Sequence, residues 1–130
     1  MKYLLDTNAV IALLNQDQRF IARLKQHSPQ DFAVSSVVMF ELYYGAAKSK
    51  KVTENIAKLN KLPFDEIPFD SLSAVMAGKI RAGLSQQGTP IGPYDVMIAG
   101  QAIAHNLVLI THNIKEFERV SELRFEDWLV

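Results

Sequence analysis

The 130-residue sequence contains no cysteine. Disulfide bonds and thiolate metal sites are therefore excluded, and the composition fits a reducing compartment. No apolar run is long enough to span a membrane, and the first residues lack the pattern of a secretory signal peptide. Lys and Arg together number 14, as do Asp and Glu, so no net charge drives broad binding to nucleic acid. We expect a cytoplasmic protein without a membrane partner, in which any nucleic-acid contact depends on a local basic patch.

Several common catalytic motifs are also missing. The sequence has neither of the glycine-rich nucleotide motifs, G-x-G-x-x-G and G-x-x-x-x-G-K-[ST], and it has no H-E-x-x-H or G-x-S-x-G. His27, His105 and His112 are too scattered to form an expected site, and a partly exposed side chain is favoured over a ligand role for His112. A phosphatase with an aspartyl nucleophile would need a second Asp two residues after Asp6, where Asn8 stands.

Short apolar stretches alternate with amphipathic stretches along the chain. This alternation predicts an α/β fold with a central, mostly parallel sheet, a three-layer α/β/α sandwich that forms one domain over residues 1–130. Strands are expected at residues 3–5, 32–35, 66–69, 107–111 and within 125–129. Helices are expected at 9–14, 19–27, 37–48, 52–62 and 71–87, then from residue 93 and again around 116–118.

Two helix starts and one strand carry more specific expectations. Ser36 is expected to cap the helix over 37–48, and Asp70 is expected to cap the helix over 71–87. Pro68 favours an edge position for the third strand. The helical period over 71–87 predicts a buried stripe made of Leu72, Val75, Met76, Ile80 and Leu84.

Three carboxylates stand in apolar surroundings. Asp6 follows the first strand, Glu41 lies inside an apolar and aromatic helix, and Asp95 falls in the first turn of a late helix. Each has a simpler explanation: Asp6 caps a helix, Glu41 reaches solvent from a narrow polar stripe, and Asp95 complements the helix dipole. The recurrence favours convergence, because the carboxyl ends of parallel strands meet at one sheet edge, where residues 111–113 also lie.

Crowded carboxylates repel one another unless a cation lies between them. Oxygen ligands with few or no imidazoles suit Mg²⁺ or Mn²⁺ better than zinc. Such a site lowers the pKa of a bound water and neutralises charge on a phosphodiester. The residues therefore predict metal-assisted hydrolysis of a phosphate ester.

Four stretches of the sequence resemble one family. LLDTN, SSVVMFELYYG, IRAGLSQQGTPIGPYDVMIAG and LITHNIKEFERV are similar to PIN-domain proteins, specifically the VapC-type toxins of type II toxin–antitoxin pairs, and the likeness runs from Leu5 to Trp128. The resemblance implies a PIN-like α/β/α fold and an Mg²⁺-dependent endoribonuclease, with Mn²⁺ able to substitute. It also implies inhibition of translation until a VapB-type antitoxin neutralises the toxin, a homodimer, and contact with promoter DNA only through the antitoxin.

The family's site residues are carried over one by one. The three acids that serve as metal ligands and catalytic residues match Asp6, Glu41 and Asp95. Many members have a fourth acid where this chain has Asn113, which puts a second metal in doubt. Asn113 would then hold a water molecule, and Glu116 would reach in from the next turn. Thr7 either hydrogen-bonds a carboxylate or acts as a simple capping hydroxyl.

The RNA and the surfaces that bind it are the least determined by the sequence. Similarity in the IGP-(aromatic)-D and EFERV stretches suggests transfer RNA, notably initiator tRNA in its anticodon stem-loop, by analogy alone. The candidate phosphate-binding residues are Lys48, Lys50, Lys51 and Arg81, and the alternative for the lysines is an ordinary solvated surface. Phe40, Tyr43 and Tyr44 offer an aromatic surface for a homodimer contact or an antitoxin groove.

Two other functions stay open at this point. One is a catalytically weak PIN domain that captures RNA or a protein partner without turnover, which the missing fourth acid favours. The other is a phosphatase that acts on small phosphate esters, which activity on such an ester and none on RNA would reveal.

Overall fold

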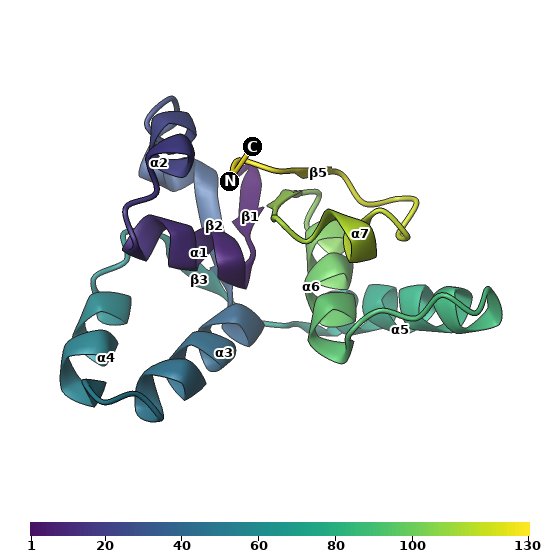
Figure 1. Cartoon of the computed structure of the whole chain (residues 1–130). Helices are drawn as coiled ribbons and strands as arrows, with labels where there is room; N and C mark the ends of the chain where they lie inside the picture. The colour runs from purple at the N-terminus through teal and green to yellow at the C-terminus, as the bar shows by residue number, and fades with distance from the viewer.

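The computed structural model describes residues 1–130, and its strands form one five-stranded sheet in the order β3-β2-β1-β4-β5 (Figure 1). Every neighbouring pair of strands is parallel, as the alternating sequence predicts. The strands are β1 (Tyr3–Leu5), β2 (Phe32–Ser35), β3 (Asp65–Ile67), β4 (Val108–Ile110) and β5 (Phe125–Glu126). The helices are α1 (Thr7–Leu14), α2 (Gln18–Leu24), α3 (Ser36–Ala47), α4 (Val52–Asn60), α5 (Ser71–Gln86), α6 (Pro93–Ala104) and α7 (Ile114–Phe117), with a 3-10 turn at Pro29–Asp31.

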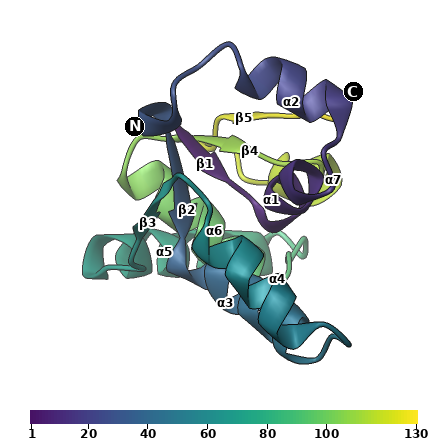
Figure 2. The same cartoon turned by 90° about the vertical axis from the view of Figure 1, so that its left-hand side faces the viewer.

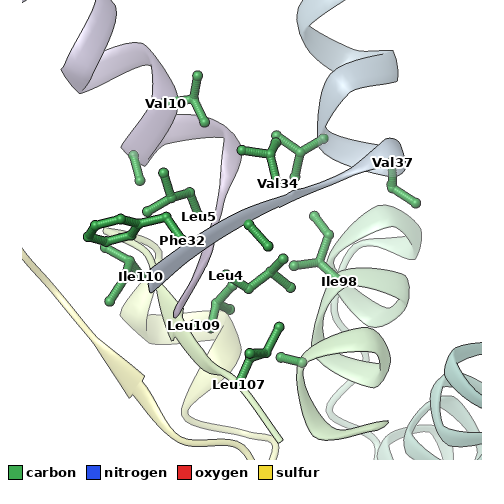
Figure 3. Close-up of a cluster of buried hydrophobic side chains, with 14 of the residues drawn as sticks. Leu4, Leu5, Val10, Phe32, Val34, Val37, Ile98, Leu107, Leu109 and Ile110 are labelled. Carbon is green, nitrogen blue, oxygen red and sulfur yellow. The ribbon is translucent and has the colours of Figure 1, made fainter. Parts of the chain in front are cut away.

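The core lies on both faces of the sheet. Leu5, Val34 and Ile110 are register partners on three adjacent strands, and they point toward Val10 of α1 (Figure 3). The preceding residues point to the other face, where Ile98 of α6 packs (Figure 3). Strands buried on both faces read as continuous apolar runs, which is why Tyr3–Leu5 and Phe32–Ser35 were recognisable as strands.

The parallel arrangement brings the ends of β1, β2 and β4 to one edge of the sheet. The amide of Asp6 donates to the carbonyl of Ile110 at 3.0 Å, so the ladder between β1 and β4 continues into Asp6. α1 starts directly after β1 and α3 starts directly after β2. The first residues of both helices therefore lie at the same edge of the sheet.

Helix α5 differs from the expectation in the face that it buries. Leu84 is buried and Met76 and Ile80 are partly buried, as expected, but Leu72 and Val75 are 54% and 53% exposed. Ser73 and Ala77 are buried in their place. The cause is close packing on α6: a Cβ at Gly100 would lie 2.6 Å from the backbone nitrogen of Ala77. The small residues let the two helix backbones approach, so α5 turns its small face inward and lies at the outside of the molecule beside α6 (Figure 1).

Several element ends also differ from the sequence prediction. The N-cap of α3 is Ser35, whose hydroxyl oxygen accepts from the Val37 amide at 3.0 Å, so the choice of Ser36 was wrong by one residue. Strand β3 ends at Ile67, before the expected Pro68, although it is an edge strand as expected. Asp70 caps α5 as predicted. Helices α3 and α4 form a hairpin that projects from the sheet (Figure 2). No helix in this structure has both the length and the apolar composition that crossing a membrane requires.

Candidate active site

Asp6 is buried at the carboxyl edge of the sheet and is held from two sides. Its Oδ1 atom accepts from the backbone N–H of Thr7 at 2.8 Å, and its Oδ2 atom accepts from the hydroxyl of Thr111 at 2.8 Å. Burial raises the pKa of Asp6, the two hydrogen bonds lower it in part, and the negative charge of Glu41 raises it again. Asp6 thus caps α1 and also presents a carboxylate in a place where its charge is disfavoured.

Glu41 lies on α3 and is joined to Asp6 through Thr7. The Thr7 hydroxyl donates to Oε1 of Glu41 at 3.2 Å, while the Thr7 backbone N–H donates to Asp6. The hydrogen bond expected between Thr7 and a carboxylate is therefore present. One residue at the start of α1 holds two acids that lie 35 positions apart in the sequence.

Asp95 lies in the first turn of α6 and is half-buried. Its pKa is raised to about 8, first by burial, then by a hydrogen bond with Glu116, and then by the charges of Asp6, Glu116 and Glu41. The pKa of Glu116 is lowered, chiefly by the same hydrogen bond and by Asn113. The two shifts are opposite in direction: the surroundings favour the neutral form of Asp95 and the ionised form of Glu116.

Asn113 contacts both members of a second pair of acids, Asp95 and Glu116, whereas Asp6 and Glu41 form the first pair. Its side-chain amide donates to Oε2 of Glu116 at 3.0 Å and approaches Oδ2 of Asp95 at 3.4 Å. Its backbone N–H donates to the hydroxyl oxygen of Thr111 at 3.0 Å. Because the Thr111 hydroxyl donates to Asp6, a continuous set of hydrogen bonds runs from Asp6 through Thr111 to Asn113 and its two acids.

The acids form two linked pairs, Asp6 with Glu41 and Asp95 with Glu116. The four side chains do not form a single set of metal ligands. No three His, Cys, Asp or Glu side chains lie close enough together to hold a metal ion between them. The donor set still fits a divalent cation of the Mg²⁺ type, which is usually held by one or two carboxylates and several waters. Burial and mutual repulsion raise the pKa of Asp6 and of Asp95, and a bound cation would relieve both effects.

The other predicted residues lie outside these pairs. Lys48, Lys50 and Lys51 occupy the turn between α3 and α4, and Arg81 lies on α5, at the opposite side of the molecule (Figures 1 and 2). His112 is exposed, and its Nδ1 atom lies 2.9 Å from Asp127. The sequence reasoning placed Thr111 at the correct edge but gave no sign of its hydrogen bonds, because its partners are distant in the sequence.

A cavity adjoins Glu41, one acid of the first pair. It has a volume of about 280 Å³ and is lined by residues of α1, α3 and α4, including Thr7, Glu41 and Leu14. A larger cavity of about 570 Å³ shares Leu14 and Lys58 with it and continues toward α2. The larger cavity has an apolar lining that includes Leu24 and Phe64, with Lys25, Lys58 and Lys61 also among the residues around it.

Comparison with known proteins decides the family. The PIN domain model matches residues 3–123. The tRNA(fMet)-specific endonuclease VapC of Salmonella typhimurium is 38% identical over 130 residues, which cover 98% of each chain. The Ribonuclease VapC2 of Haemophilus influenzae is 39% identical over 134 residues, which cover 99% of each chain. This chain belongs to the VapC ribonucleases of the PIN-domain family.

The fold agrees with that assignment. A crystal structure of DNA-bound VapBC from Salmonella typhimurium contains a chain with a TM-score of 0.92 and 37% identity, and the match covers 98% of both chains. The PIN fold expected from the sequence is therefore confirmed, and the chain is a nuclease of the VapC type.

Proposed function

We propose that residues 1–130 form a single PIN domain that cuts transfer RNA with the help of Mg²⁺, for which Mn²⁺ substitutes. The observation that carries the proposal is the gathering of Asp6, Glu41, Asp95 and Glu116 at one sheet edge, where burial and the charges of neighbouring acids raise the pKa of Asp6 and of Asp95. The name of the Salmonella relative supports initiator tRNA as the substrate. A cut in the anticodon stem-loop and a stop to translation in the cytoplasm are further parts of the proposal, made by analogy with the family.

The proposed metal ligands are Asp6, Asp95 and Glu41. When bound, the cation lowers the pKa of a water molecule and neutralises charge on the phosphodiester that is cut. Thr7 and Thr111 hold the Asp6 carboxylate by hydrogen bonds at both of its oxygens. Such outer partners fix the orientation of metal ligands and tune their affinity.

Asn113 and Glu116 complete the proposed site. The amide of Asn113 donates to Glu116 and approaches Asp95, so it adds a further link between two carboxyl groups that already share a hydrogen bond. The side-chain carbonyl oxygen of Asn113 accepts no hydrogen bond within the chain, and we assign it to a water molecule in the catalytic complex. Glu116 is the proton partner of Asp95 and orients it from the next turn.

We also propose a VapB-type antitoxin as the partner, in line with the VapBC complexes among the structural matches. Two neighbouring cavities beside α1, which share Leu14 and Lys58, offer it apolar surface with lysines around it, and the smaller cavity reaches Glu41. A basic side chain at the tail of the antitoxin would pair with the carboxylates and compete with the cation. Contact with promoter DNA would be made by the antitoxin, since this chain has no net charge.

We propose that the chain forms a homodimer through exposed aromatic side chains of α3. Phe40 and Tyr44 are 54% and 61% exposed on α3, and the Phe40 ring meets Tyr94 with centroids 5.7 Å apart. Tyr43 is not part of this surface, because its hydroxyl donates to Asn60 of α4 at 3.0 Å. Aromatic side chains are enriched in the buried centres of interfaces.

We propose that the lysines of the α3–α4 turn bind the phosphate backbone of the RNA. Lys50 has no ion-pair partner in the chain, Lys48 lies over the Tyr44 ring at 4.7 Å, and Lys51 pairs with Glu54 at 4.0 Å. Arg81 lies on α5 and not in this turn, so it would contact a separate stretch of RNA. Replacing the three lysines by Gln should weaken binding and flatten its dependence on salt.

The proposal is tested by cleavage of total RNA with the purified protein in Mg²⁺, followed by mapping of the cut ends. Cleavage that stops with EDTA and disappears in Asp6→Asn, while Glu122→Gln on the surface cuts normally, supports a metal-dependent nuclease. RNA binding without cuts would favour the weakly catalytic binding domain, for which Asn113 in place of an acid is the supporting observation. Activity on a chromogenic phosphate ester and none on RNA would favour a phosphatase.

The partner is tested in cells. Expression of the chain alone should slow growth, and co-expression with the small protein encoded beside it should restore growth and give a stable complex. Harmless expression of folded, abundant protein would count against the toxin assignment.

A further inference from the structure

The two segments that carry Asp95 and Glu116 are joined at a point away from the acids. The Nη1 atom of Arg119 donates to the backbone carbonyl of Pro90 at 2.9 Å. Pro90 lies in the loop that leads into α6, and Arg119 lies just after the end of α7. This hydrogen bond therefore ties the start of the helix that carries Asp95 to the short helix that carries Glu116.

The same loop packs directly against both acids. A Cβ on Gly92 would lie 3.3 Å from Oδ2 of Asp95, so the loop backbone touches that carboxylate closely. The backbone N–H of Gly92 faces the Glu116 carboxylate and favours its ionised form. A displacement of the loop relative to α7 would consequently change the distance between the two carboxylates.

Helix α7 is anchored in the core by Phe117, while its polar side carries Glu116. Helix α7 has only four residues, and a helix of one turn has little stability of its own. The two carboxyl groups share a hydrogen bond with each other, and the Asn113 side chain contacts both. Arg119 forms no salt bridge with either acid, and its charge makes only a minor contribution to the lowered pKa of Glu116. Its side-chain hydrogen bond goes to the Pro90 carbonyl instead.

We propose that Arg119 is a positioning residue that fixes the spacing of Asp95 and Glu116 and thereby the affinity of the site for its divalent cation. The proposal rests on the proposed function, because it takes these acids as part of a metal site. Arg119 itself touches neither the cation nor the scissile phosphate.

The test compares Mn²⁺ binding, measured by electron paramagnetic resonance without RNA, in wild type and Arg119→Ala. The expected result is a roughly 10-fold weaker Mn²⁺ affinity, the size typical for loss of an outer partner of a metal site. In cleavage assays kcat should fall at limiting Mn²⁺ and recover at high Mn²⁺, while KM for RNA stays constant. Arg119→Lys, which keeps one donor within reach of Pro90, should recover part of the affinity.

Arg124→Ala is the matched control. Arg124 also lies in the C-terminal segment, and its Nη2 atom donates to the backbone carbonyl of Asn106 at 3.1 Å. Asn106 precedes β4, so this bond lies at the amino ends of the strands, away from the acids. Arg124→Ala should lower the melting temperature without changing Mn²⁺ affinity. Should Arg119→Ala fail to fold, Arg119→Met keeps the aliphatic stem, lacks the donors, and allows the same comparison.

Two results would overturn the proposal. Unchanged Mn²⁺ affinity in folded Arg119→Ala would show that the hydrogen bond to Pro90 does not set the site. A raised KM for RNA with unchanged Mn²⁺ affinity would make Arg119 an RNA-binding residue instead. If wild type itself binds no Mn²⁺ and cuts no RNA, the proposed function fails first, and that outcome is distinct from a defect confined to Arg119 variants.

Discussion

The hydroxyl of Thr111 donates a hydrogen bond of 2.8 Å to Oδ2 of Asp6, a buried contact that joins the end of β4 to the residue after β1. The same hydroxyl oxygen accepts from the Asn113 amide at 3.0 Å. Thr111 therefore links Asp6, in the first pair of acids, to Asn113, which contacts both acids of the second pair. Thr111 directly follows β4, and its backbone N–H donates to the carbonyl of Glu126 at 3.0 Å, which holds this link in place.

Thr111→Val should weaken both the fold and the metal site. Valine keeps the shape of the side chain but leaves an Asp6 oxygen and the Asn113 N–H without partners, at a cost of about 1–3 kcal/mol for each buried group. Mn²⁺ affinity should fall roughly 10-fold, as for other outer partners of metal ligands. Urea unfolding and Mn²⁺ titration measure the two effects, and Thr111→Ser should retain both properties. Wild-type Mn²⁺ affinity in Thr111→Val would mean that Asp6 is held well enough by Thr7.

Asp6→Asn should nearly abolish RNA cleavage while raising the melting temperature of the metal-free protein. The substitution preserves shape and removes a charge that burial and Glu41 disfavour. Cleavage in Mg²⁺ and thermal unfolding in EDTA measure the two expectations. Full activity in this variant would remove Asp6 from the mechanism, and a lower melting temperature would contradict the repulsion argument.

The metal-free protein should lose stability as the pH rises. The pKa of Asp95 is raised from 3.8 to about 8 in the folded protein, so protonation of Asp95 favours folding. This contribution is complete below pH 3.8 and is lost as the pH rises toward 8. The lowered pKa of Glu116 acts in the opposite direction, but only under acidic conditions.

Thermal unfolding in EDTA measures this dependence. The melting temperature should drop by several degrees between pH 5 and pH 8, and Asp95→Asn should show a smaller drop than wild type. Added Mn²⁺ should restore stability most strongly at high pH, where the carboxylates are ionised. Equal slopes in wild type and Asp95→Asn would show that the pKa of Asp95 is not raised.

The position of Asn113 separates two models of the site. Asn113→Ala removes the group between Glu116 and Asp95, and Glu116→Ala removes the proton partner of Asp95. If the site depends on either residue, Mn²⁺ affinity should fall roughly 10-fold in that variant. Asn113→Asp should bind Mn²⁺ more tightly and melt at a lower temperature in EDTA, because it adds a fifth carboxylate. Wild-type behaviour of all three variants would mean that Asp6, Glu41 and Asp95 suffice.

The candidate acids were recognisable in the sequence because a lone carboxylate in an apolar stretch violates the local pattern. Asp6, Glu41 and Asp95 stood out for that reason, and the structure places them at one edge of the sheet. Strands β1 and β2 were recognised at their observed bounds because both are buried runs of apolar residues. These features depend on residues that are close together in the chain.

Features that depend on distant residues were missed. The buried face of α5 is set by the contact of Ala77 with Gly100 on another helix, so the apolar period was right at Leu84 and wrong at Leu72 and Val75. The Arg119–Pro90 bond spans 29 positions, and the Thr111–Asp6 bond spans 105. No pattern within one segment predicts such contacts, because each partner is an ordinary residue in its own segment.

The last prediction concerns the aromatic surface of α3. Phe40 and Tyr44 are more than half exposed, so replacing both by Ser should leave the melting temperature of a monomer nearly unchanged. If they form the centre of the proposed homodimer, the double variant should be monomeric by size-exclusion chromatography with light scattering under conditions where wild type is a dimer. The matched control is Leu72→Ser with Val75→Ser, an equally exposed aliphatic pair on α5. A monomer from the α5 pair and a dimer from the α3 pair would place the interface on α5. If wild type is itself monomeric and the α3 variant instead fails to bind the antitoxin, the aromatic surface belongs to the antitoxin contact.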